Sequence, residues 1–203
     1  MEKLQSTARK LDIFFRIVQI FITVALVASL VGMAIIGAYF LFDLSPAMIG
    51  TGYGSVELGF LDLEIADSVE LSVDVIILGA AAELALGFLC LLTVRHCVQC
   101  VRNILAPMAE GSPFNGAASQ NLGRLARYTL VLGIKLNLMS ILGNVITAQA
   151  YDLPGLLMNE NIVHMTMNYY FDLSFVLIAA VFALLAYVFR YGEELQQLSD
   201  ETL

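Results

Sequence analysis

One long apolar stretch decides the fold of this chain: residues 17–42 read IVQIFITVALVASLVGMAIIGAYFLF. The stretch has no Asp, Glu, Lys or Arg, and it exceeds the ~20 residues that a helix needs to cross a bilayer. It is too long for the apolar part of a cleaved signal peptide, and no clear small-residue cleavage site follows it. We therefore expect a retained membrane-spanning helix over 17–42.

Three further apolar runs follow, over 75–94, 129–149 and 170–189. Hydrophobic residues make up 59% of the 203 residues, and the mean hydropathy is +0.82, far above the values of a soluble domain. Four spans and their connections use the whole chain. The sequence therefore predicts an all-α membrane protein, a four-transmembrane-helix bundle that forms one integral membrane domain over 1–203.

Basic residues indicate how the spans are oriented. All but one of the ten Lys and Arg residues lie before the first span, between the second and third, or after the fourth: Lys3, Arg9, Lys10, Arg16, Arg95, Arg102, Arg124, Arg127 and Arg190. Basic segments stay inside the cell, so we expect both termini and the connection 95–128 on the cytoplasmic side of the membrane. The net charge of −8 is then mostly external. This distribution argues against direct nucleic-acid binding, because phosphate contacts need a basic surface.

Apolar and polar residues alternate from Phe60 to Val75, which predicts a small external β-hairpin between the first two spans, over about 57–74, with its turn at 66–68. In that pairing one face of the hairpin carries four carboxylates, those of Asp62, Glu64, Glu70 and Asp74. Such a face suits Ca²⁺ or a cationic peptide. A solvated polar face is the simpler interpretation, because no EF-hand spacing is present.

Polar residues also interrupt the apolar runs. Glu83 lies ~16 Å from the cytoplasmic end of the second run, where a charge normally faces protein or water. Asn137, Ser140 and Asn144 form a stripe on the third run at helical spacing. We expect these four residues to cluster, either as interhelical hydrogen bonds or as a site for an ion, a proton or a small ligand. Lys135 is expected to reach toward the inner head groups or to pair with Glu83.

The segment 95–100 reads RHCVQC, which places two cysteines three residues apart beside a histidine. A structural zinc site normally needs four ligands, and the chain offers no second pair. We expect no metal and no cofactor, with Cys97 and Cys100 as structural thiols and a redox or metal role as the alternative. The sequence has no Gly-rich phosphate loop, no nucleophile elbow and no His-Glu-x-x-His motif, so we expect no enzyme activity.

Two predicted cytoplasmic segments carry a family resemblance. Residues 102–114 read RNILAPMAEGSPF, and residues 188–200 read VFRYGEELQQLSD. They resemble the bacterial domain-of-unknown-function 2975 family, whose members have four spans, a Gly-x-Pro-Phe turn before the third span and a tail that begins Phe-Arg-x-Gly. The positions that match these motifs are Gly111, Pro113, Phe114, Arg190 and Gly192. The tail departs from the family where this chain has Leu198, Ser199 and Asp200.

The resemblance implies a cytoplasmic partner, because members are often encoded beside a small helix-turn-helix regulator. Our leading hypothesis is a non-enzymatic sensor or regulatory partner that couples an external or intramembrane signal to such a regulator. One alternative is a small ion or solute transporter that uses Glu83, Asn137 and Asn144. The other is an immunity protein against cationic membrane-active peptides. We expect the lipid bilayer to contact all four spans. The helices leave enough lipid-facing area for contacts with further copies of the chain in a homo-oligomer.

Overall fold

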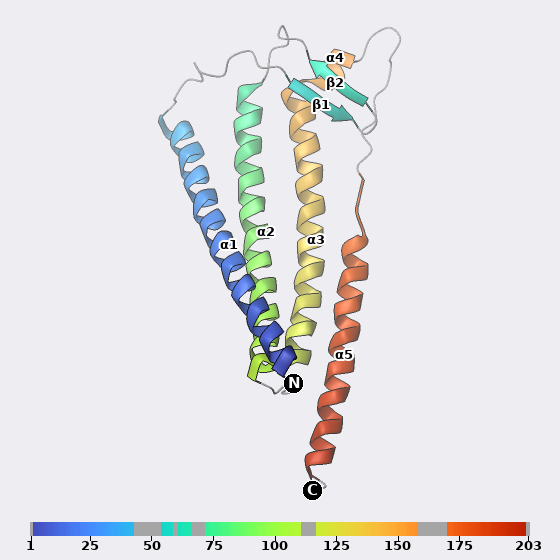
Figure 1. Cartoon of the computed structure of the whole chain (residues 1–203). Coiled ribbons are helices and arrows are strands. Elements are labelled where there is room, and N and C mark those ends of the chain that lie inside the picture. The colour runs from blue at the N-terminus through green and yellow to red at the C-terminus, as the bar shows by residue number, and fades with distance from the viewer. Residues whose placement is uncertain are drawn as a thin grey trace. The chain divides into compact units, whose positions relative to one another are not determined.

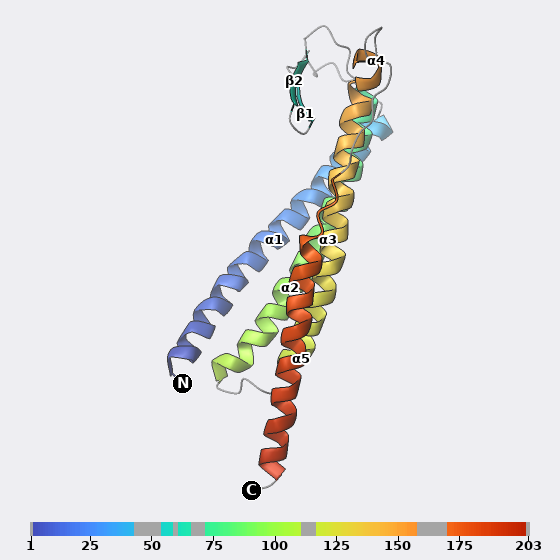
Figure 2. The ribbon, with the colours of Figure 1, turned by 90° about the vertical axis from the view of Figure 1, so that its right-hand side faces the viewer.

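The computed structural model describes residues 2–42, 54–58, 61–65, 72–110, 117–157 and 170–201. These residues form four long helices, α1 (Glu2–Phe42), α2 (Val73–Glu110), α3 (Ala117–Ala150) and α5 (Ser174–Glu201), and the short helix α4 (Leu153–Leu157) (Figure 1). Figure 2 shows α5 in front, again as one continuous ribbon. Within the described ranges, each of the four has the length and hydropathy of a membrane span. The structure thus confirms an all-α, multi-pass membrane protein.

The two strands do not form the hairpin that the sequence predicted. Strand β1 (Gly54–Leu58) pairs antiparallel with β2 (Leu61–Ile65), with Gly54 opposite Ile65. Residues 61–65 therefore pair with the segment before them. The predicted second strand was wrong at Ser72 and Val73, which are not in a strand, and its residues 69–71 lie outside the described residues. Val73 and Asp74 instead begin α2. A carboxylate in the first turn favours this start, because it faces the positive end of the helix dipole.

Helix α2 extends beyond the apolar run 75–94 and continues to Glu110, with Pro107 inside it. A proline in the last turn removes only one hydrogen bond, at the carbonyl of Asn103, which is a limited cost. The fourth apolar run becomes helical only at Ser174 rather than at Tyr170.

The chain divides into two compact units. Unit 1 comprises Met1–Ala28, Phe88–Asn137 and Phe171–Leu203, and unit 2 comprises Ser29–Gly87 and Leu138–Tyr170. The apolar core of unit 1 joins α1 to α2 through three buried residues, with other apolar side chains packed against them: Ile22, Leu26 and Val98, with Phe15, Val18, Phe88, Leu91, Leu92 and Val94. This small core suits a protein whose apolar surface faces lipid rather than water.

In unit 2, α2 and α3 approach each other closely at a glycine. A Cβ atom on Gly79 would overlap the side chain of Ile146, so only glycine allows this spacing. The backbone N–H of Ser72 donates to the carbonyl of Ala150, which ties the start of α2 to the end of α3. Beyond α3, Asp152 has a φ of 45°, a left-handed conformation that aspartate tolerates better than most residues.

In unit 1, a second glycine sets the contact between α3 and α5. A Cβ atom on Gly133 would overlap the aromatic ring of Phe175. We expect Gly133→Ala to lower the free energy of unfolding by ~1–3 kcal/mol, because an added methyl group overpacks this contact. Loss of helical circular dichroism, on titration of the protein from mild detergent into a denaturing one, measures the change.

Gly123 on the same helix is the matched control. Among the described residues, nothing lies within 4 Å of a Cβ atom placed on it. Gly123→Ala should leave stability unchanged or raise it by up to ~1 kcal/mol, because alanine is the better helix former. Equal effects of the two substitutions would contradict the close contact at Gly133.

Candidate functional site

The junction of α3 and α5 in unit 1 depends on one buried amide. The Asn137 side chain is 7% exposed, and its Nδ2 donates to the Gly133 carbonyl at 2.8 Å and to the Asp172 carbonyl at 2.9 Å. Its Oδ1 accepts from the backbone N–H of Asp172 at 2.8 Å. Asn137 therefore satisfies both backbone polar groups of a residue that lies just outside a helix.

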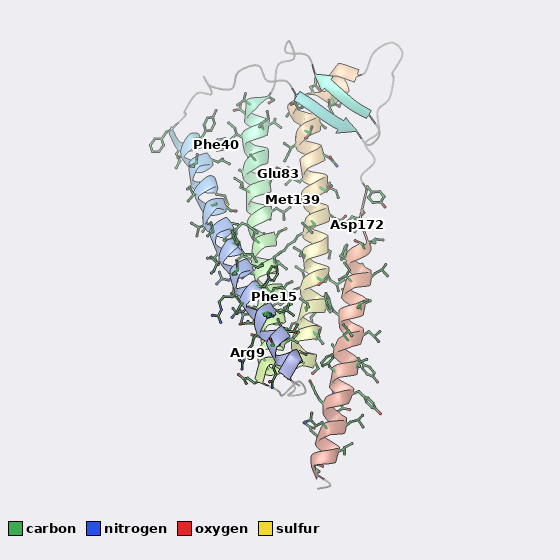
Figure 3. The ribbon with its side chains drawn as sticks, in the orientation of Figure 1. Arg9, Phe15, Phe40, Glu83, Met139 and Asp172 are labelled. Atoms are coloured by element: carbon green, nitrogen blue, oxygen red, sulfur yellow. The ribbon has the colours of Figure 1, made fainter. Side chains whose placement is uncertain are left out.

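Asp172 in turn caps α5, and Figure 3 shows it directly before the first turn of that helix (Figure 3). Its two carboxylate oxygens accept from the backbone N–H and the hydroxyl of Ser174, each at 2.8 Å. These bonds satisfy the backbone N–H of the first residue of α5, which has no partner within the helix.

The other end of α5 contacts the beginning of α3. Glu193 accepts from the hydroxyl of Ser119 at 2.7 Å and from its backbone N–H at 3.4 Å. Ser119 lies in the first turn of α3, where backbone N–H groups have no partner within the helix. A carboxylate there also meets the positive end of the helix dipole. Two polar contacts thus fix α5 against α3, one near each end of their shared length.

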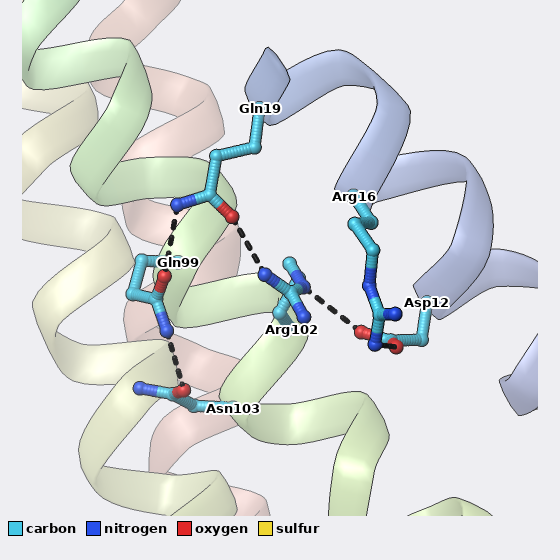
Figure 4. A network of polar contacts seen from close by, with 6 residues as sticks. All are labelled: Asp12, Arg16, Gln19, Gln99, Arg102 and Asn103. Atoms are coloured by element: carbon cyan, nitrogen blue, oxygen red, sulfur yellow. Dashed lines mark hydrogen bonds and ion pairs between the residues drawn. The ribbon is translucent and has the colours of Figure 1, made fainter. Parts of the chain in front are cut away.

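A polar network joins α1 to α2 at the same end of unit 1 (Figure 4). The guanidinium of Arg102 donates to Asp12 Oδ1 at 2.9 Å and to Gln19 Oε1 at 2.6 Å. Gln19 donates to Gln99 at 3.3 Å, and Gln99 donates to Asn103 at 3.1 Å. The side chains of Arg102 and Asp12 are each 23% exposed, so this ion pair lies partly inside the helix contact.

The sequence analysis missed this network, although a signal was present. On α1, polar residues recur at spacings of four, three and four: Asp12, Arg16, Gln19 and Thr23. Such spacing places them on one face of a helix. Asp12 is also the one acidic residue between Lys3 and Phe42. A single carboxylate in a basic, apolar segment indicates a cationic partner on another helix.

Lys135 bonds across to α2, and neither of its two partners there is Glu83, the expected ion-pair partner. Its Nζ donates to Thr93 Oγ1 at 2.7 Å and to the Leu89 carbonyl at 3.0 Å. Thr93 is 5% exposed, and its own hydroxyl also donates to the Leu89 carbonyl. The ammonium group of Lys135 is therefore held by neutral oxygens within unit 1.

The expected intramembrane polar cluster divides between the two units. Asn137 lies in unit 1 with the contacts given above, while Glu83, Ser140 and Asn144 lie in unit 2. Glu83 is half-buried, and its Oε1 lies 3.0 Å from the position of a Cβ atom on Gly143. Ser140 and Asn144 are exposed. Glu83 thus packs against the backbone of α3 in unit 2.

The remaining predicted site residues lie on several different elements. Asp62 and Glu64 belong to β2, and Asp74 is an exposed residue of α2. Arg190 forms an exposed ion pair with Glu194 at 3.3 Å, one turn further along α5, and Gly192 lies between them. Four predicted positions lie outside the described residues: Glu70, Gly111, Pro113 and Phe114.

The histidine and cysteines of α2 have packing contacts. The ring of His96 stacks on that of Tyr128, with centroids 5.4 Å apart and planes 16° from parallel. Cys90 and Cys100 are buried free thiols, and Cys97 is half-buried. In the part of the chain that the structure describes, no group of three His, Cys, Asp or Glu side chains is placed to hold a metal ion.

Comparison with known proteins returned no similarity: no family model matches the chain, and no curated protein and no solved structure is significantly similar to it. The fold and the contacts above therefore carry the functional argument, and the family resemblance stays a prediction.

Asn137 and Asn144 provide a matched test of the α3–α5 junction, because they are the same residue type on one helix and only Asn137 is buried. We expect Asn137→Ala to destabilise the protein by ~1–3 kcal/mol, since it leaves the Asp172 backbone groups without their partner. Asn144→Ala should change stability by less than ~0.5 kcal/mol. Detergent-denaturation curves measure both, and equal losses would contradict the role of Asn137.

The ion pair of Arg102 and Asp12 allows a double-mutant cycle. We expect Arg102→Met to cost ~1–3 kcal/mol, because it leaves a partly buried carboxylate with one fewer partner. Adding Asp12→Asn should restore part of that loss, which gives a coupling energy of ~0.5 kcal/mol or more. Arg190→Met, which breaks an exposed pair, should cost less than ~0.5 kcal/mol. Additive losses in the cycle would show that the pair is not coupled.

Proposed function

We propose that this chain is a non-enzymatic sensor or regulatory partner in a bacterial cytoplasmic membrane, with both termini in the cytoplasm. It couples an external or intramembrane signal to a cytoplasmic helix-turn-helix regulator. The proposal joins the structure of α5 to the resemblance with the domain-of-unknown-function 2975 family.

One observation carries the proposal: α5 is a single unbroken helix with a polar contact to α3 near each end. It runs from the Asp172 cap, through the expected span, into the tail that holds Glu193. The contacts at Asn137 and Ser119 are 18 residues apart on α3, or ~27 Å. A displacement of the segment before Ser174 would therefore move the tail, because a continuous helix transmits an axial shift over its length.

The tail also has a surface that suits a protein partner. Beyond Arg190, three apolar side chains recur at helical spacing, Tyr191, Leu195 and Leu198, and they are 58%, 50% and 60% exposed. Residues at i, i+4 and i+7 share one helix face, which is how an amphipathic helix docks into the groove of another protein. The predicted topology places this stripe on the cytoplasmic side.

The two alternatives gain less support. The transport hypothesis needs the Asn137 amide for a solute, but that amide is bonded to Gly133 and Asp172. The immunity hypothesis depends on an acidic hairpin face whose predicted second strand was wrong at Ser72 and Val73, and its residue Asp74 lies in α2.

A photo-cross-linking amino acid at position 195 tests the docking surface in cells. We expect cross-links to a soluble regulator from position 195, and cross-links to lipid alone from position 184, a 63% exposed leucine inside the span. Leu195→Glu should reduce recovery of the regulator about tenfold or more, because a charge in the apolar stripe opposes docking.

Gln196→Glu is the matched control, since it adds the same charge at an exposed neighbouring position. It should leave recovery of the regulator within about twofold of the unsubstituted protein. Cross-links from position 195 to lipid alone, or equal losses in the two variants, would overturn the proposed function.

A further inference from the structure

A shallow groove of about 320 Å³ runs along α1 in unit 1. It is lined by five residues at spacings of three, one, three and one: Arg16, Gln19, Ile20, Thr23 and Val24. These positions form one stripe on the helix surface, ~12 Å long from Arg16 to Val24. None of the contacts proposed for the sensing role involves this stripe.

The groove is polar at one end and apolar at the other. Arg16 stands directly before the uncharged run 17–42, and its side chain is 64% exposed. Further along the span, Ile20 and Val24 are 59% and 62% exposed. In a bilayer this order places a cation at the level of the phosphates and aliphatic side chains beside the acyl chains. A phospholipid has the same sequence of chemical groups.

The charge at the polar end is not balanced. Asp12 bonds to Arg102 at 2.9 Å and forms a longer ion pair with Arg16 at 3.5 Å, so one carboxylate serves two guanidinium groups. Arg9 lies seven residues before Arg16, on the same helix face, and is exposed. The end of the groove therefore carries an excess of positive charge that an anion can neutralise.

The inner part of the groove has a fixed polar wall. The Gln19 side chain is held by Arg102 and Gln99, and the hydroxyl of Thr23 donates to the Gln19 carbonyl at 2.8 Å. A lipid that lies in the groove does not need to order these side chains, and pre-ordered groups favour binding.

We propose that this groove binds one anionic phospholipid of the leaflet that surrounds the amino-terminal end of α1. The guanidinium of Arg16 pairs with the lipid phosphate, and Ile20 and Val24 contact the upper part of an acyl chain. Any basic segment next to a membrane is attracted to an anionic lipid surface without binding a particular lipid molecule. The proposed site differs because it binds one lipid molecule at a defined position.

Native mass spectrometry of the full, delipidated chain tests the site. The protein, in neutral detergent micelles, is titrated with phosphatidylglycerol and, separately, with zwitterionic phosphatidylcholine. We expect one phosphatidylglycerol to bind at a concentration at least about fivefold lower than phosphatidylcholine, as one basic contact is worth ~1 kcal/mol. Arg16→Gln should weaken phosphatidylglycerol binding about fivefold for the same reason.

Arg190→Gln is the control for diffuse electrostatics. Arg190 is 74% exposed and, like Arg16, forms an ion pair with an acidic residue one helical turn away, so the substitution removes the same charge from a similar setting. It should change phosphatidylglycerol binding by less than about twofold. Equal losses in Arg16→Gln and Arg190→Gln would overturn the site and leave only general attraction to an anionic surface.

Three further measurements separate the lipid from other ligands and guard against misfolding. Val24→Trp fills the apolar part of the groove without a change of charge and should weaken phosphatidylglycerol binding, while Arg16→Lys should preserve most of it. Soluble glycerol phosphate should not displace the bound lipid. Displacement by glycerol phosphate at equal concentration, or normal lipid binding by Val24→Trp, would overturn the lipid assignment, in the first case in favour of a free-phosphate site.

Discussion

Hydrocarbon offers no hydrogen-bond partners, so every backbone polar group at membrane depth must be satisfied inside the protein. This constraint governs the place where α5 begins. Asn137 lies ten residues, or ~15 Å, beyond Arg127 on α3, well inside the apolar run 129–149. The segment that precedes α5 meets α3 at this level without helical hydrogen bonds of its own. The Asn137 amide replaces them by bonding to both the N–H and the carbonyl of Asp172.

The same constraint explains why polar contacts determine the register of the helices in unit 1. Lipid tails are as apolar as leucine, so burial of apolar side chains gives little preference for one alignment of two helices over another. Contacts that fit one alignment supply that preference. Between α3 and α5 these are Asn137 with Asp172, Ser119 with Glu193, and the ring of Phe175 against Gly133. Between α1 and α2 the ion pair of Asp12 and Arg102 has the same effect.

The sequence was sufficient to locate each long helix, because that depends on one segment alone. It was insufficient to predict which residues of two different segments are in contact. Hydropathy located the four long helices, because each span must be apolar over its own length. The spacing of Asn137, Ser140 and Asn144 correctly placed them on α3, but periodicity does not say which helix lies opposite a given turn. Alternation in 61–65 indicated a strand and could not decide between the neighbouring segments as its partner. The pairing of Asp12 with Arg102 spans ninety positions, and no local pattern fixes such a pair.

Two surfaces of unit 1 differ in charge, and we propose a different partner for each: a protein for the tail of α5 and a phospholipid for α1. On α5, Arg190 and Glu194 balance each other, and the tail beyond them presents an apolar stripe that favours protein contact over attraction to phosphate. On α1, one carboxylate serves two guanidinium groups, which leaves positive charge for a lipid head group. Arg16 and Arg102 share that carboxylate. If a lipid phosphate pairs with Arg16, the ion pair of Arg16 with Asp12 is lost. Asp12 then pairs with Arg102 alone, which would strengthen the contact between α1 and α2. A lipid bound at the surface of α1 would in this way stabilise the helix packing of unit 1.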